Sequence, residues 1–231
     1  MSLALSNLDL LYASVGEDMQ ETVRETRKNV LRMYRVIRKY EIGEALRSGK
    51  LIMDTGPHAV AGILERVRVY ALAAAAEQGV EIKLEAPQGL VAACDAEVIE
   101  HVLWNLLENA MNATPTGGKV TFRAERVASG VRIAIEDTGI GFGDADTEQL
   151  IKAASGTSGL GISRELLRLQ GSALTLSRRE AGTEASFILP ETEVNALHSP
   201  VPGVLAIHGV TEADIELSAL KIIKSSGESS D

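Results

Sequence analysis

The first 48 residues carry apolar side chains at intervals that fit helices. In residues 17–47, apolar positions recur at spacings of three, four and seven, which predicts one long amphipathic helix. These positions are Met19, Val23, Val30, Met33, Val36 and Ile37. Leucines between positions 3 and 11 predict an earlier helix, and a break at residues 14–16 makes the two an antiparallel helical hairpin over residues 1–48. Because a hairpin cannot bury its apolar stripe alone, we expect it to form a homodimer; a helical cap on the neighbouring domain is the alternative.

Residues 51–190 mix helical periodicity with strand-like alternation. After a short extended piece at 51–54, helices are predicted at about 55–78, 96–113 and 162–170, the second with Asp95 as its N-cap. Strands are predicted at 80–85, 89–94, 119–125, 131–136, 173–177 and 184–189. Helices with largely antiparallel strands indicate the α+β class, here a two-layer α/β sandwich that ends at Pro190.

Residues 191–231 form a C-terminal extension whose pattern predicts no chemistry. A strand at 204–207 and a helix at 212–223 are expected, and the closing SSGESSD is typical of a disordered end. Its role is left open.

Composition limits the function classes that this chain can belong to. An apolar content of 45% over 231 residues supports a folded core, and a formal charge of -9 disfavours non-specific binding of nucleic acid. The single cysteine, Cys94, excludes an internal disulfide, and its apolar setting predicts a buried structural thiol. The sequence shows neither a membrane-spanning run nor a signal peptide, so we expect a cytoplasmic location for this part of the protein, either alone or as the cytoplasmic part of a larger or membrane-bound sensor.

Two asparagines lie four residues apart in the predicted helix at 96–113. Asn105 and Asn109 therefore project from one face of that helix. Their amide oxygens can ligate a hard cation such as Mg²⁺, which shares its ligands with substrate phosphates. Hydrogen bonding to nearby backbone is the alternative for this pair.

Asp137 follows a predicted strand and precedes Thr-Gly-Ile-Gly. A carboxylate at a strand end can accept a hydrogen bond from an exocyclic amine, which suits adenine and does not suit guanine. Gly139 and Gly141 let the backbone pass close to a base. Taken alone, this motif is equally compatible with a hairpin turn.

A second glycine-rich loop, Gly156-Thr-Ser-Gly-Leu-Gly161, directly precedes the predicted helix at 162–170. Backbone amides at the N-terminus of a helix bind anions, so the loop is a candidate phosphate cradle. Residues 142–155 are expected to form a mobile lid, in which Lys152 reaches a terminal phosphate or is simply a solvated lysine.

NLLENA, DTGIG and GLG, in this order and at these distances, resemble the asparagine box and the two glycine boxes of sensor histidine kinases of two-component systems. Their ATP-binding domain, the Bergerat-type fold, belongs to the superfamily that also holds gyrase, Hsp90 and MutL. GTEASFILP at 182–190 is similar to the last strand of that domain, and the resemblance covers about residues 51–190. It implies a site for ATP and Mg²⁺, with Asn109 as the metal ligand, Asp137 at the adenine, and Asn105 and Lys152 as catalytic residues. The implied nucleotide-binding residues are Asn105, Asn109, Asn112, Asp137, Gly139, Gly141, Gly156, Thr157, Ser158, Gly159, Leu160, Gly161 and Thr183.

The asparagine box also bears on the reaction type. ATP-hydrolysing relatives carry a Glu four residues before the metal-binding Asn, where it acts as a general base. Here that position is Asn105, which cannot accept a proton, and this favours phosphoryl transfer over hydrolysis. Glu108, about a hundred degrees round the helix from Asn109, is expected to be a surface residue.

The first 48 residues resemble the dimerisation and phosphotransfer helices of the same kinases, but with a truncated first helix. None of the histidines stands in the phosphoacceptor context of the family; they are His58, His101, His198 and His208. Two departures concern the phosphate contacts: a Ser is inserted in GTSGLG, and Asn112 replaces a common lysine.

The resemblance implies the catalytic core of a sensor histidine kinase, which transfers the γ-phosphate of ATP to a histidine outside this chain. The implied partners are a second copy of the chain and the receiver domain of a response regulator. A pseudokinase that regulates a partner without phosphotransfer is the alternative, and an ATPase of the gyrase or Hsp90 type is a third class, disfavoured by Asn105.

Overall fold

A computed structural model describes residues 7, 10, 11, 14–49, 51–143, 146–154, 156 and 158–192. Its elements begin with the long helix α2 (Glu17–Arg47), which has the predicted bounds. Most of the first arm of the predicted hairpin lies outside the described residues, so the hairpin stays a prediction. The expected strand and helix after residue 192 also lie outside them.

A five-stranded mixed sheet forms one layer of the fold, in the order β2-β4-β5-β7-β6. The strands are β2 (Glu81–Glu85), β4 (Lys119–Val127), β5 (Gly130–Asp137), β6 (Thr175–Arg178) and β7 (Thr183–Leu189). β2 pairs with β4 in parallel, and the other pairs are antiparallel. Alternate residues of β5 point to opposite faces, so Val131, Ile133 and Ile135 are buried in the core while Arg132 and Glu136 lie on the outer face.

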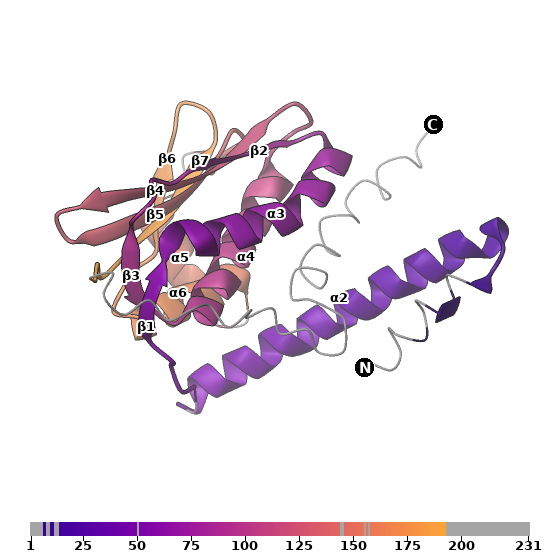
Figure 1. The fold of residues 1–231 in the computed structure, drawn as a ribbon, viewed down its shortest axis with the longest axis horizontal. Coiled ribbons are helices and arrows are strands. Elements are labelled where there is room, and N and C mark those ends of the chain that lie inside the picture. The colour runs from indigo at the N-terminus through magenta and orange to yellow at the C-terminus, as the bar shows by residue number, and fades with distance from the viewer. Residues whose placement is uncertain are drawn as a thin grey trace.

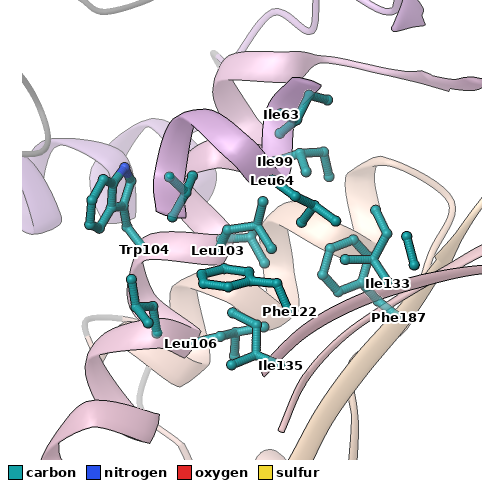
Figure 2. Packing of buried hydrophobic residues seen from close by; sticks show 14 of the residues in the cluster. Ile63, Leu64, Ile99, Leu103, Trp104, Leu106, Phe122, Ile133, Ile135 and Phe187 are labelled. Atoms are coloured by element: carbon teal, nitrogen blue, oxygen red, sulfur yellow. The ribbon is translucent and has the colours of Figure 1, made fainter. Parts of the chain in front are cut away.

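Helices α3 (Val60–Gln78), α4 (Ala96–Ala113) and α6 (Gly159–Leu169) form the second layer, and α2 runs along the side of that layer away from the sheet (Figure 1). The core lies between the two layers. Figure 2 shows the ring of Phe122 from β4 next to Leu103 of α4, and Phe187 of β7 beside Ile133 of β5. The predicted two-layer α+β sandwich is therefore confirmed.

The helix predicted at 55–78 begins later than expected, so the predicted start is wrong. Residues Gly56–Ala59 form strand β1, which pairs antiparallel with β3 (Val91–Cys94) in a separate two-stranded ribbon. Pro57 lacks an N–H group, and the N–H of Val60 donates to the carbonyl of Leu90. Helix α3 therefore begins only at Val60.

The N-cap of α4 agrees with the prediction. The side chain of Asp95 accepts from the N–H of Val98 at 3.1 Å and from the N–H of Asp54 at 2.8 Å. The neighbouring Cys94 is fully buried, and burial, with the charge of Asp95 as a smaller cause, raises the pKa of its thiol to about 12. The expected structural thiol is confirmed.

Two further elements lie near the glycine loops. Helix α5 (Thr147–Ala153) occupies half of the segment expected to be a lid, and Asp146 caps it. Helix α6 begins at Gly159, three residues earlier than predicted, because the side chain of Ser158 accepts from the N–H of Gly161 at 3.1 Å and caps the helix. Among the described residues, no helix combines the length and the apolar character needed to cross a bilayer.

Candidate functional site

A cavity of about 410 Å³ opens between α4, the start of α6 and one end of the sheet. Of the residues predicted for the site, it brings together Asn109, Asn112, Asp137, Gly141, Leu160 and Thr183. Its other lining residues were not predicted, and they are mainly apolar: Leu106, Ala110, Ala113, Ile135, Phe142, Leu176 and Ala185. A mostly apolar cavity with a few converging polar groups is typical of a small-molecule site.

Asp137 is the buried charged group of this cavity. Its Oδ1 accepts from the N–H of Gly139 at 2.8 Å and from the N–H of Thr183 at 3.2 Å. Burial raises the pKa of this carboxyl, while the two backbone N–H groups act in the opposite direction. Within the described residues Oδ2 makes no hydrogen bond, so it keeps its acceptor capacity for a ligand.

Two glycines give Asp137 its close backbone surroundings. Gly182 has a φ of 84°, and a Cβ at this position would lie 2.0 Å from the carbonyl oxygen of Asp137. A Cβ at Gly139 would lie 2.4 Å from the carbonyl oxygen of Ala113. Both positions therefore exclude side chains. Gly182 was not among the predicted site residues, although its place before Thr183 in GTEAS was a usable signal.

Asn105 lies apart from the cavity lining, at the junction of α4, α6 and α2. It is 1% exposed, and neither its amide oxygen nor its amide nitrogen has a hydrogen-bond partner in the described part of the chain. A Cβ at Gly159 would lie 3.0 Å from the Asn105 oxygen and 3.5 Å from Nζ of Lys39. An orphaned amide therefore stands beside the first residue of α6, where the sequence predicted phosphate binding.

Glu108 is not the surface residue that the sequence predicted. Its side chain is only 13% exposed and pairs with Lys39 of α2, with Nζ 3.5 Å from Oε2. The prediction failed because it considered α4 alone, whereas α2 packs beside it. This ion pair and the contact of α2 with α6 join the long helix to the cavity-bearing layer.

The remaining predicted residues are less closely assembled. Lys152 is 74% exposed on α5 and pairs with Glu148 at 3.0 Å, so the structure does not bring it to the cavity lining. Gly156 is exposed with open space around it, Ser158 and Gly161 are joined by the helix cap, and Thr157 lies outside the described residues. The inserted Ser of the second glycine box thus has a structural role as a cap.

Residues 94–193 match the family described as histidine kinase-, DNA gyrase B- and HSP90-like ATPase. Residues 94–193 therefore carry a domain similar to this ATPase family. The match agrees with the position of the cavity, which lies between α4, the helix of Asn105 and Asn109, and the two glycine-rich segments. The domain is an ATP-binding one, as the three motifs indicated.

The curated relatives that this chain matches include histidine kinases. Histidine protein kinase DivJ from Caulobacter vibrioides is 34% identical over 125 residues, which are 48% of this chain and 21% of the relative. Adaptive-response sensory kinase SasA from Synechocystis is 26% identical over 207 residues, 82% of this chain and 54% of the relative. The chain thus spans 21% and 54% of the lengths of these two proteins.

Solved structures show the same fold. Histidine kinase AdeS from Acinetobacter baumannii superposes with a TM-score of 0.63 at 17% identity, covering 83% of this chain and 95% of the solved AdeS chain. Full-length ShkA in complex with AMPPNP gives a TM-score of 0.67 at 20% identity, covering 87% of this chain and 44% of ShkA. At these identities the likeness concerns the fold alone.

Proposed function

We propose that the chain is the catalytic core of a sensor histidine kinase, which binds ATP with Mg²⁺ and transfers the γ-phosphate to a protein histidine. The observation that carries this proposal is Asp137, a buried carboxylate whose Oδ1 is held by two backbone N–H groups in an apolar cavity. The free acceptor of that carboxylate suits the exocyclic amine of adenine. Around it, Leu106, Ile135 and Leu176 offer the apolar surface that a flat base requires.

The polar edge of the cavity fits a metal-bound polyphosphate. Asn109 and Asn112 are exposed side chains on α4 that line the cavity, and the described residues contain no cluster of three or more His, Cys, Asp or Glu to hold a metal alone. One amide oxygen together with phosphate oxygens matches the way Mg²⁺ binds in nucleotide sites. When bound, Mg²⁺ neutralises the charge that develops on the transferred phosphoryl group.

Two other residues of α4, Asn105 and Glu108, favour phosphoryl transfer over hydrolysis of ATP. Asn105 cannot act as a general base, and its orphaned amide beside Gly159 fits a hydrogen-bonding role near the phosphates. The chain's own contribution is then to bind and orient the nucleotide. Glu108 is held by Lys39, which makes it a poor substitute base.

We extend the proposal to partners and to domain organisation. Helix α2 exposes Met33, Val36, Ile37 and Tyr40 on one face, as expected for a helix that pairs with a second copy within a hairpin at 1–48. A response regulator is the expected recipient of the phosphoryl group; one neighbour in fold, histidine kinase ThkA, was solved in complex with the response regulator TrrA. This function implies a cytoplasmic location. In this proposal the ATP-binding domain spans residues 51–190, and residues 191–231 are a C-terminal extension.

The proposal is tested with labelled Mg-ATP and a histidine-bearing helical hairpin supplied as a separate chain. We expect acid-labile, base-stable label on the hairpin, much less label with Asp137→Asn at ATP concentrations that do not saturate the variant, and little steady release of phosphate. Steady release of phosphate that Asp137→Asn abolishes would instead assign the chain to the ATP-hydrolysing class.

A further inference from the structure

Seven charged side chains alternate in sign across the outer face of the sheet. The series begins with Glu85, Arg123 and Glu136, joined at 2.8 Å and 3.5 Å. It continues through Arg179, Glu184, Arg132 and Glu125. This network lies on the face opposite the core, and one of its members, Glu136, directly precedes Asp137.

Glu136 and Glu184 are opposite one another in the antiparallel pairing of β5 with β7. Two carboxylates in such a pair repel unless a cation lies between them. Arg179, in the turn between β6 and β7, supplies that cation: it pairs with Glu136 at 3.0 Å and also with Glu184. The Glu184 side chain is only 3% exposed, so solvent screens the charge of Glu184 poorly.

Each carboxylate of this pair is next in sequence to a residue of the nucleotide site. Glu136 precedes Asp137, and Glu184 follows Thr183, whose N–H donates to Asp137 Oδ1. Arg179 also donates its own N–H to the carbonyl of Gly182 at 3.3 Å. The ion pairs of Arg179 therefore draw together the two strand ends that orient the Asp137 carboxylate.

We propose that Arg179 is a positioning residue for nucleotide binding: its bridge between Glu136 and Glu184, here called the Arg179 bridge, keeps the Thr183 N–H on Asp137. Arg179 is 47% exposed on the outer face, whereas the cavity lies on the core face, so it acts through the strand ends and does not touch the nucleotide. This inference rests on the proposed adenine site.

The test measures ADP binding by calorimetry on the 231-residue chain. Arg179→Gln removes the one cation that Glu136 and Glu184 share and leaves each carboxylate only its other arginine, Arg123 for Glu136 and Arg132 for Glu184. The two strand ends are then no longer bridged, and we expect the dissociation constant to rise about fivefold. Arg179→Lys should lose less. Arg126→Gln is the matched control. Arg126 of β4 also forms an ion pair, with Glu191, but it lies opposite Val131 in the pairing of β4 with β5, away from the strand end that carries Asp137. We expect this control to bind ADP like the original chain.

A compensating variant separates the bridge from a general loss of structure. Glu136→Gln in the Arg179→Gln background removes the repulsion, so ADP affinity should return to within about twofold of the original chain. An Arg179→Gln variant with unchanged affinity, or a double variant as weak as the single one, overturns the inference while leaving the adenine site in place.

A second measurement needs no nucleotide. Amide exchange of Thr183, followed by NMR, should be faster in Arg179→Gln and restored in the double variant, because its hydrogen bond to Asp137 opens more often. An unchanged exchange rate of the Thr183 amide in Arg179→Gln would overturn the inference that the Arg179 bridge holds this hydrogen bond. A chain that binds no ADP but shows this exchange pattern would contradict the proposed function and leave the bridge standing.

Discussion

The two ends of the candidate site are built in different ways. At the Asp137 end, backbone N–H groups hold the carboxylate, and neighbouring backbone excludes any side chain at Gly182. At the other end, the predicted residues Asn109 and Gly156 are exposed, and Lys152 pairs with Glu148 away from the cavity. Under the proposed function, we expect the Asp137 end to be formed before a nucleotide binds and the phosphate end to assemble around the nucleotide and its metal. Substitutions at the two ends should therefore differ in size and in their dependence on Mg²⁺.

Asp137→Asn should give the largest effect. It exchanges the charged acceptor for an amide, and the loss of a hydrogen bond to a charged group, about 1.5–3 kcal/mol, corresponds to a roughly 10- to 150-fold weaker ADP affinity. Because burial raises the pKa of this carboxyl, the buried charge does not stabilise the free chain at neutral pH. The melting temperature without nucleotide should accordingly be unchanged or higher. Calorimetry and thermal unfolding check both outcomes, and a variant that loses stability along with affinity would contradict a purely local role.

Gly182→Ala should come next, with ADP affinity lowered about tenfold and unfolding at a lower temperature. Its Cβ would lie 2.0 Å from the Asp137 carbonyl, and a left-handed φ costs about 1–2 kcal/mol in a residue other than glycine. Gly143→Ala is the matched control, because Gly143 has a φ of 58° with nothing within 4 Å. Equal affinity losses in the two variants would mean that backbone strain alone, and not contact with Asp137, is responsible.

Asn109→Ala tests the phosphate end of the comparison. We expect about fivefold weaker binding of Mg-ATP, the equivalent of one hydrogen bond of about 1 kcal/mol, and little change for ADP in the presence of a chelator. Titrations of the variant and the original chain with and without Mg²⁺ show whether Asn109 acts through the metal. If the loss is the same in both, Asn109 contacts the nucleotide and does not act through the metal.

The pH dependence of ADP binding tests the charge of Asp137. The deprotonated carboxylate is the acceptor, and its pKa lies above that of an ordinary aspartate, so affinity should begin to fall at a higher pH than for an ordinary aspartate. Below that pKa the fall is at most about tenfold per pH unit. A carboxyl with a raised pKa in the folded state adds stability as the pH falls through that pKa, so unfolding through Asp137 does not explain the loss. Calorimetry from neutral to mildly acid pH measures the fall in ADP affinity. In Asp137→Asn, the part of this fall that is due to protonation of Asp137 should be absent.

Lys152→Ala should have the smallest effect, within about twofold on ADP affinity. Lys152 is exposed and pairs with Glu148 on its own helix, an interaction worth about 0.3–0.5 kcal/mol. A larger loss with ATP than with ADP would show that α5 brings Lys152 to the terminal phosphate, as the sequence predicted.

Local pattern predicted the elements whose determinants lie within a few residues. Helix α4 has the expected bounds because its cap, Asp95, and its apolar face are both local. Strand β1 was missed because Gly56–Ala59 is a strand only through pairing with residues 91–94. The start of α6 was misplaced because the inserted Ser158 serves as a cap.

The site shows the same division. The three motifs were sufficient to predict Asn109, Asp137 and Gly141 at one cavity. The hydrogen bond from Thr183 to Asp137 joins residues 46 positions apart, and the Lys39–Glu108 pair joins two helices, so neither follows from local pattern. Long-range contacts of this kind are decided by the packing of the sheet and the helices.

The most direct test of the central claim is calorimetric titration of the chain with ADP and, separately, with GDP. Asp137 can accept a hydrogen bond from the amino group of adenine, whereas guanine presents an acceptor at the same position. We predict that ADP binds, that GDP binds at least about tenfold more weakly, and that Asp137→Asn removes most of this preference. Equal binding of ADP and GDP, or a preference that Asp137→Asn leaves intact, would contradict the account.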